Sequence, residues 1–113
     1  MHIDPSRSIC TVIVTVDGED EEMRFVVNHA SAGLDRFSSF PGFIAGATHL
    51  SEDGRRVIQY LQWESKETYE ACLNNPSWDE DESAKRFVAL MESGAIRVDV
   101  RIYNIVSTRK QPA

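Results

Sequence analysis

The sequence has few of the residues that mark metal, redox or membrane proteins. It contains only two cysteines, Cys10 and Cys72, which form no CxxC pair, and three histidines without metal-ligand spacing. Both cysteines lie in apolar segments and are expected to be reduced core residues. No apolar run approaches the roughly 20 residues of a membrane-spanning helix, and Met1 to Arg7 has no apolar signal-peptide core. We therefore expect a cytoplasmic protein with no metal and no membrane partner.

Positive charge is also scarce. Lys and Arg number 12 against 18 Asp and Glu, which gives a formal net charge of -6. Nucleic-acid binding needs clustered basic residues to replace counterions, so this class of partner is not expected. The 113 residues, 42% hydrophobic and 27% charged, suit one folded globular domain. We expect a single domain over residues 1–113, with loose termini at 1–7 and 107–113.

The hydrophobic pattern switches repeatedly between a period of two, typical of strands, and about 3.6, typical of helices. In the first strand, Cys10, Val12, Val14 and Val16 share one face, while Ile9 and Ile13 lie on the other. The predicted elements are a strand over 9–16, a helix beginning in the acidic residues 19–22 and ending near 38, strands over 43–50 and 56–63, a short helix capped by Ser65, a helix from about 76 or 79, and a strand over 96–106.

This element order is that of an α+β, ferredoxin-like βαββαβ domain. It has a four-stranded antiparallel sheet with helices on one face, and the other face is bare. The first strand carries apolar residues on both faces, so the bare face is not fully polar. Packing of two such faces in a homodimer would cover it, whereas a monomer would have to expose it.

One stretch carries a family resemblance. Residues 40–69 read FPGFIAGATHLSEDGRRVIQYLQWESKETY, with a Pro-Gly-Phe before a hairpin, an Asp-Gly turn and Trp63 where a strand gives way to a helix. This stretch resembles the antibiotic biosynthesis monooxygenase family. The resemblance implies a dimeric α/β barrel that oxidises polycyclic aromatic substrates with O2 and without a cofactor.

The resemblance also implies site residues. Strand parity puts Val57, Gln59, Leu61 and Trp63 on one face. Family members usually carry Asn at the position of Gln59 and share the tryptophan at Trp63; both are proposed to hold the substrate carbonyl and the anion formed from it. We predict Gln59 and Trp63 as catalytic residues, in the wall of a closed apolar cavity. Tyr69, Arg86 and Leu61 are predicted substrate-binding residues, with Arg86 the weaker positional match.

Plainer interpretations stand beside these roles. Trp63 suits a core position, Tyr69 suits packing, and Arg86 suits a solvated helix surface. His29 lies beside the apolar stripe of the first helix, and His49 precedes the hairpin turn. For both histidines we expect a surface or core role rather than that of a catalytic base.

The resulting functional hypothesis is a cofactor-independent monooxygenase that converts an anthrone or phenolic, polyketide-like substrate to a quinone with O2. The alternatives are a non-oxidative polyketide cyclase and a small-molecule-binding dimer on the same fold. Haem-degrading relatives fit poorly, because the first strand has no Asn and residues 65–95 contain no His.

Overall fold

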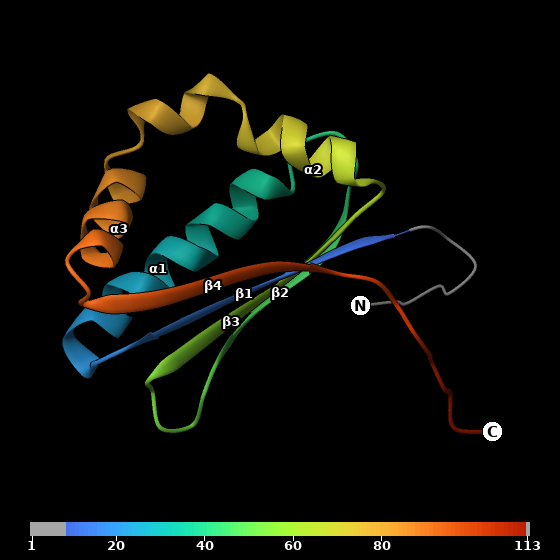
Figure 1. Ribbon diagram of the computed structural model, residues 1–113, viewed down its shortest axis with the longest axis horizontal. Coiled ribbons are helices and arrows are strands. Elements are labelled where there is room, and N and C mark those ends of the chain that lie inside the picture. The colour runs from blue at the N-terminus through green and yellow to red at the C-terminus, as the bar shows by residue number, and fades with distance from the viewer. Residues whose placement is uncertain (1–8, 113) are drawn as a thin grey trace.

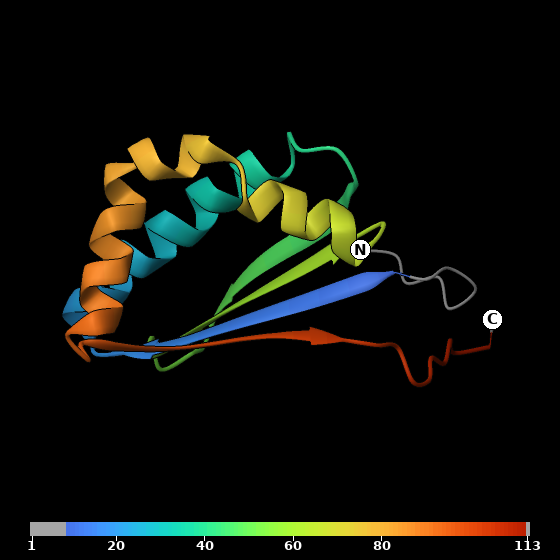
Figure 2. The same ribbon diagram turned by 45° about the horizontal axis from the view of Figure 1, so that its top comes forward.

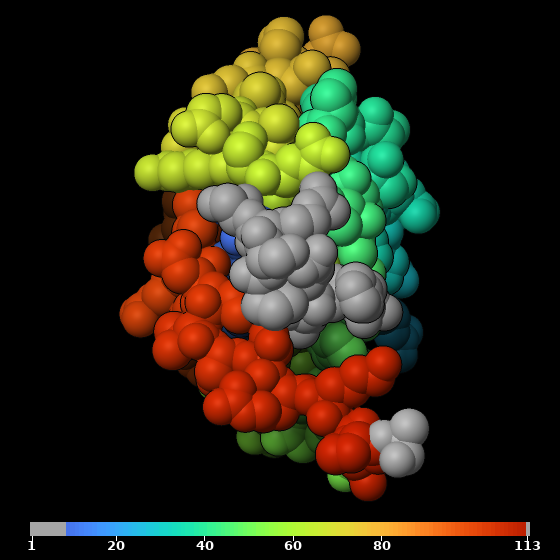
Figure 3. All heavy atoms as spheres, turned by 90° about the vertical axis from the view of Figure 1, so that its right-hand side faces the viewer, coloured from blue at the N-terminus to red at the C-terminus, as the bar shows by residue number. Residues whose placement is uncertain are grey.

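The computed structural model describes residues 9–112, so the predicted loose segment 1–7 lies outside the described range, as does Ala113. The elements in chain order are β1 (Cys10–Gly18), α1 (Asp20–Phe37), β2 (Phe43–Leu50), β3 (Arg56–Trp63), α2 (Lys66–Leu73), the 3-10 helix η1 (Pro76–Glu80), α3 (Glu82–Glu92) and β4 (Ile96–Tyr103). Residues 104–112 contain no helix or strand. They continue beyond the end of the sheet at which α2 begins (Figure 1), and Figure 3 views the molecule from that end.

The sheet has the strand order β2-β3-β1-β4, and every neighbouring pair is antiparallel. All the helices lie on one face of it (Figure 1). The predicted ferredoxin-like α+β architecture is therefore confirmed, with η1 as a short addition between α2 and α3.

The strand register fixes which side chains face the helices. In the antiparallel sheet, Val12 is opposite both Leu61 of β3 and Ile102 of β4, so these three share a face. Val12 and Leu61 are almost fully buried under the helices. Gln59 and Trp63 have the same parity as Leu61, and this confirms the predicted orientation of β3.

Local sequence signals account for where the helices begin. Three acidic residues occupy the first turn of α1, where the positive end of the helix dipole stabilises them. Ser65 caps α2 in a capping box with Thr68. The helix predicted from about 76 or 79 is instead divided, because Asp81 adopts an extended conformation and its side chain accepts hydrogen bonds from the first turn of α3.

Two hydrophobic clusters fill the space between sheet and helices. One surrounds Trp63, with Cys10, Val12, Leu61, Tyr69 and Cys72. The other surrounds Val16 and Val26 near the start of α1. Trp63 packs against Phe37, Phe43 and Tyr69, with ring centroids 6.1, 5.3 and 5.8 Å away.

The last strand is shorter than predicted and less covered. It ends at Tyr103 rather than near 106. Ile96 is buried, but Val100 and Ile102, which have the same parity, are 51% and 44% exposed. The helices cover β1, β2 and β3 and leave the distal half of β4 open (Figure 2). The alternating pattern of β4 thus predicts its two faces correctly but not how far the helix layer extends.

The helix-free face is mixed in character. Ile13, Ile58 and Tyr60 are half-buried there, and Thr11 and Gln62 are 4% and 0% exposed. Within the described residues, the Thr11 hydroxyl and the Gln62 amide have no hydrogen-bond partner. A homodimer through this face stays a prediction.

Candidate functional site

A pocket of about 450 Å³ lies between the sheet and the helices. Its wall is mainly apolar and includes Val14, Val26, Phe37, Leu61 and Phe87. Two other lining residues, Leu73 of α2 and Val100 of β4, are 49% and 51% exposed. The pocket is therefore open to solvent on this side, whereas the sequence led us to expect a closed cavity. Its size and apolar wall suit a small organic ligand.

Gln59 enters the pocket wall from β3 and is 6% exposed. Its Nε2 donates to the carbonyl oxygen of Ala30 at 2.8 Å and to Oγ1 of Thr48 at 3.2 Å. A backbone carbonyl only accepts, so the Ala30 contact fixes which end of the amide is nitrogen. Both amide hydrogens are thus in use. The sequence-based view of Gln59 as a donor to the substrate is corrected: the group left for a ligand is the acceptor Oε1.

Trp63 lies behind the pocket rather than in its wall. Its side chain is fully buried, and it is absent from the lining residues, contrary to the expected placement. Phe37 and Tyr69, which both line the pocket, pack on the indole. Within the described residues the indole Nε1–H has no hydrogen-bond partner. Buried donors are normally paired, so this N–H is a candidate contact for a group outside residues 9–112, such as a ligand.

The other predicted site residues separate into two groups. Leu61 and Tyr69 line the pocket. Burial raises the pKa of the Tyr69 phenol, which is therefore neutral at physiological pH. Arg86 is exposed, and its guanidinium carbon lies 4.3 Å from the centroid of the Phe25 ring, outside the pocket. The structure therefore does not bring Arg86 together with Gln59.

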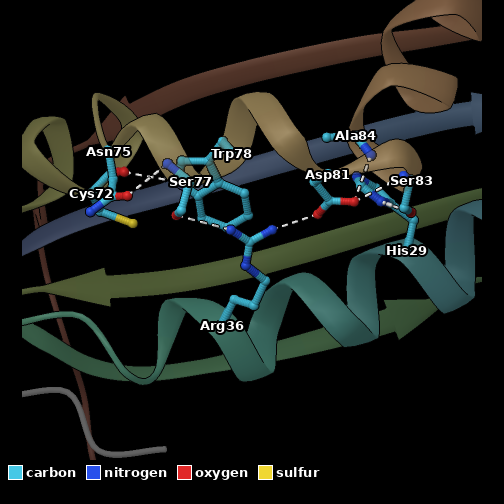
Figure 4. Close-up of polar contacts among 9 residues, drawn as sticks. All are labelled: His29, Arg36, Cys72, Asn75, Ser77, Trp78, Asp81, Ser83 and Ala84. Atoms are coloured by element: carbon cyan, nitrogen blue, oxygen red, sulfur yellow. Dashed lines mark hydrogen bonds and ion pairs between the residues drawn. The ribbon is translucent and has the colours of Figure 1, made fainter.

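The cation in the pocket wall is Arg36, which the sequence analysis missed. It extends from the last turn of α1 and makes an ion pair with Asp81 (Figure 4). It also donates to Oγ of Ser77 at 3.2 Å, and its guanidinium carbon lies 3.7 Å from the centroid of the Trp78 ring. These contacts join α1 to η1 and to the start of α3.

Asp81 is the partner of Arg36 and the N-cap of α3. Desolvation raises the pKa of its carboxyl group, but the backbone N–H groups of Ala84 and Ser83 and the charge of Arg36 outweigh that effect. The pKa of Asp81 consequently lies below its ordinary value. Its carboxylate is ionised and already bonded on several sides.

His29 is the second missed residue. It lines the pocket, and its Nδ1 lies 2.6 Å from Oγ of Ser83 (Figure 4). Its ring stacks between Phe25 and Phe87, with centroid separations of 5.6 and 4.8 Å. Burial lowers the pKa of His29, and the nearby Asp81 opposes this shift only in part. The imidazole is thus neutral at pH 7.

A sequence signal for both missed residues does exist. His29 and Arg36 are seven residues apart, about two helical turns, and therefore lie on the same side of α1. That side borders the apolar stripe formed by Val26, Ala30 and Phe37. What the sequence does not provide is the position of Ser83 and Asp81, which are 54 and 45 residues further along the chain than their partners.

Other chemistries have little support in the described part of the chain. Residues 9–112 contain no group of three or more His, Cys, Asp or Glu side chains placed to hold a metal ion. Burial raises the pKa of the Cys72 thiol to about 11, so its nucleophilic thiolate is scarce at neutral pH. None of the helices in this range has both the length and the apolar character to cross a bilayer.

The sequence matches no protein-family model. It is 31% identical to tetracenomycin-F1 monooxygenase of Streptomyces glaucescens over 75 residues, which cover 66% of this chain and 67% of that protein.

Solved structures share the fold. The ActVA-Orf6 monooxygenase of Streptomyces coelicolor, in complex with nanaomycin D, superposes with a TM-score of 0.68 at 22% identity over 96% of both chains. An anthrone oxidase-like protein gives a TM-score of 0.71 at 26% identity over 96% of this chain and 48% of that one. SnoaB of Streptomyces nogalater, a cofactor-independent oxygenase, gives 0.64 at 15% identity over 92% of this chain and 99% of that one. The chain has the same fold as these oxygenases and is similar in sequence to tetracenomycin-F1 monooxygenase over 67% of that protein. It therefore belongs to the antibiotic biosynthesis monooxygenase family.

Proposed function

We propose that this protein is a cofactor-independent monooxygenase that oxidises an aromatic, polyketide-like substrate, an anthrone or a phenol, to a quinone with O2. The observation that carries the proposal is an apolar pocket of about 450 Å³, with a few polar groups, in a member of this family. Tetracenomycin-F1 monooxygenase is the relative that points to an aromatic polyketide. The two free, buried cysteines suit the reducing cytoplasm that we propose as its location.

The chemistry needs an environment more than a reagent. An anthrone that has lost a proton is an electron-rich carbanion, which can give one electron to O2. Recombination of the resulting radical pair forms a peroxide, and loss of water leaves the quinone. The apolar wall excludes water, so each dipole directed at the developing negative charge has a larger effect than in solution.

Four of the predicted site residues receive roles in this proposal. Gln59 accepts a hydrogen bond from a substrate hydroxyl through Oε1, because its two N–H groups are held by Ala30 and Thr48. Trp63 supplies its Nε1–H, which has no partner within residues 9–112, to the substrate oxygen when the overlying Tyr69 moves aside. Leu61 and Tyr69 supply apolar contact area. Arg86 is left out because it lies outside the pocket.

The experiment is oxygen uptake by chelator-treated protein with anthrone, with the quinone quantified. Trp63→Phe and Gln59→Leu should each slow turnover roughly ten- to a thousandfold, because Trp63→Phe removes a donor to the substrate oxygen and Gln59→Leu removes the acceptor that positions a substrate hydroxyl. Both variants should unfold within a few degrees of the wild-type protein. The control is Arg86→Met, which should retain the wild-type rate. Wild-type rates in all three variants would reduce Gln59 and Trp63 to packing residues.

The alternative of a non-oxidative cyclase or a binding protein makes a different prediction. Saturable binding of aromatic ligands without oxygen uptake, for anthrone and for phenolic analogues alike, would favour it over the oxygenase. Both N–H groups of the Gln59 amide are bonded within the protein, and its Oε1 is left to contact a ligand in an oxygenase or in a binding protein.

We also propose a homodimer through the helix-free sheet face. Ile13, Ile58 and Tyr60 give this face an apolar centre that a second copy would remove from water. Sedimentation at micromolar concentration should give a species of twice the 12.8 kDa chain mass. A single species at 12.8 kDa would refute the dimer.

A further inference from the structure

We propose that His29 is the general base that removes the proton from the bound substrate. This assignment rests on the proposed oxygenase function. It deepens that function, because the reaction begins with loss of a proton and neither Gln59 nor Trp63 can take one. The supporting observations are the position of His29 in the pocket wall, the fixed orientation of its ring, and the absence of a second suitable base among the described lining residues.

The contacts of the ring leave one nitrogen for the substrate. Nδ1 is held by Oγ of Ser83 at 2.6 Å, and the ring plane is held between Phe25 and Phe87 at interplanar angles of 19° and 21°. Within residues 9–112, Nε2 has no hydrogen-bond partner, and it is not among the unpaired atoms that are fully buried. With the proton on Nδ1 donated to Ser83, Nε2 carries the lone pair that a base needs.

The charges around His29 suit a base that starts neutral and becomes positive. Its apolar neighbours favour the neutral ring before reaction. Asp81, at the start of α3, favours the imidazolium once it has formed, and Arg36 on α1 partly offsets that attraction. Arg86 lies on the Phe25 ring that stacks on His29.

The remaining titratable groups of the wall are poor bases. Asp81 is a weak base, because two backbone N–H groups and Arg36 already bind its carboxylate. Tyr69 is a neutral phenol, since burial raises its pKa. The guanidinium of Arg36 has donors only and no lone pair for a proton. His29 is the one described lining residue that can both accept a proton at pH 7 and return it.

The proton balance of the reaction is complete with this one base. His29 Nε2 takes a proton from the anthrone methylene, and the C–H electron pair enters the enolate. O2 accepts one electron from it, the radicals join in a C–O bond, and the peroxide oxygen takes the proton back from His29. As the O–O bond breaks, the C–H electron pair forms the new C=O bond, and the departing hydroxide takes the second C–H proton to give water. The sum is anthrone plus O2 to quinone plus water, with O2 as the oxidant.

The kinetic test uses His29→Gln and His29→Phe, the second of which retains a ring between Phe25 and Phe87. Both should lower kcat for anthrone oxidation roughly a hundredfold or more, with a smaller change in KM. His49→Gln is the matched control, since His49 is exposed near the end of β2 and does not line the pocket. It should retain the wild-type kcat.

The pH profile separates a base from a structural residue. Wild-type kcat should fall as the pH decreases and His29 becomes protonated, whereas His29→Phe should lose this acidic limb and gain rate only as hydroxide increases. Added imidazole should partly restore turnover in His29→Ala. Unchanged kcat and an unchanged acidic limb in the His29 variants would overturn the assignment while leaving the oxygenase proposal intact.

A measurement without turnover decides the assignment if the wild-type protein does not oxidise anthrone, a result that would overturn the oxygenase proposal itself. The probe is alizarin, a dihydroxyanthraquinone whose visible absorption shifts when a phenol ionises. If His29 accepts its proton, the wild-type protein should ionise bound alizarin at a lower pH than His29→Phe does. Identical titration curves for the two proteins, or no binding of alizarin by either, would overturn the role of His29.

Discussion

Substitution of Gly42 by alanine tests how the site is held in place. Gly42 lies between α1 and β2 with a φ of 88°, in the left-handed region that side chains disfavour. A Cβ atom there would lie 2.4 Å from Cβ of Thr68 and 2.6 Å from its Cγ2 and Oγ1. Thr68 cannot easily turn away, because its hydroxyl is engaged in the capping box with Ser65.

The expected magnitude has two parts. The left-handed backbone costs an alanine about 1 kcal/mol or somewhat more. Forcing extra atoms into a well-packed contact costs roughly 1–3 kcal/mol in addition. Gly42→Ala should therefore lower the free energy of unfolding by roughly 2–4 kcal/mol. For a domain of this size the corresponding decrease in Tm is about 8–16 °C.

Two other glycines provide matched controls. Gly54 and Gly94 have φ values of 76° and 81°, but a Cβ at either position would meet nothing within 4 Å. Gly54→Ala and Gly94→Ala should show only the backbone part, about 1 kcal/mol. The assay is urea unfolding of the three variants at one protein concentration. Equal losses in all three variants would refute the steric argument for Gly42.

Further predictions concern the newly recognised residues and the cysteine. Arg36→Met should lower the free energy of unfolding in urea by about 1 kcal/mol, because it removes a partly exposed ion pair and a cation–π contact, and it should raise KM for anthrone. Arg86→Met should change neither quantity. Equal effects of the two substitutions would contradict the placement of Arg36 in the pocket wall and of Arg86 outside it. The lowered pKa of His29 means that the unfolded chain binds more protons below pH 6.5, so the free energy of unfolding should decrease as the pH falls through that value. The pH dependence of the free energy of unfolding should be weaker in His29→Phe. An equal pH dependence in the two proteins would be evidence against the lowered pKa of His29. Cys72, with a pKa of about 11, should resist iodoacetamide at pH 7 in the folded protein, and rapid labelling would contradict its burial.

The sequence by itself determined the order of elements, the fold class and the two faces of each strand. Side chains alternate along a strand with a period of two, so Gln59, Leu61 and Trp63 had to share one face once β3 was recognised. The turn at 51–54 and the cap at Ser65 are also local signals, because their hydrogen bonds join residues at most five positions apart. The family resemblance in residues 40–69 depends on the same local features.

Only the tertiary structure decided what each polar group touches. The depth of Trp63 depends on how Phe37 and Tyr69, from two different helices, meet above it. The direction of the Gln59 amide depends on a carbonyl group 29 residues away. Periodicity fixes the direction of a side chain relative to its own element, but not its partner on another one. The contacts of His29 with Ser83 and of Arg36 with Asp81 arise from the packing of α1 against the start of α3, which no local pattern encodes.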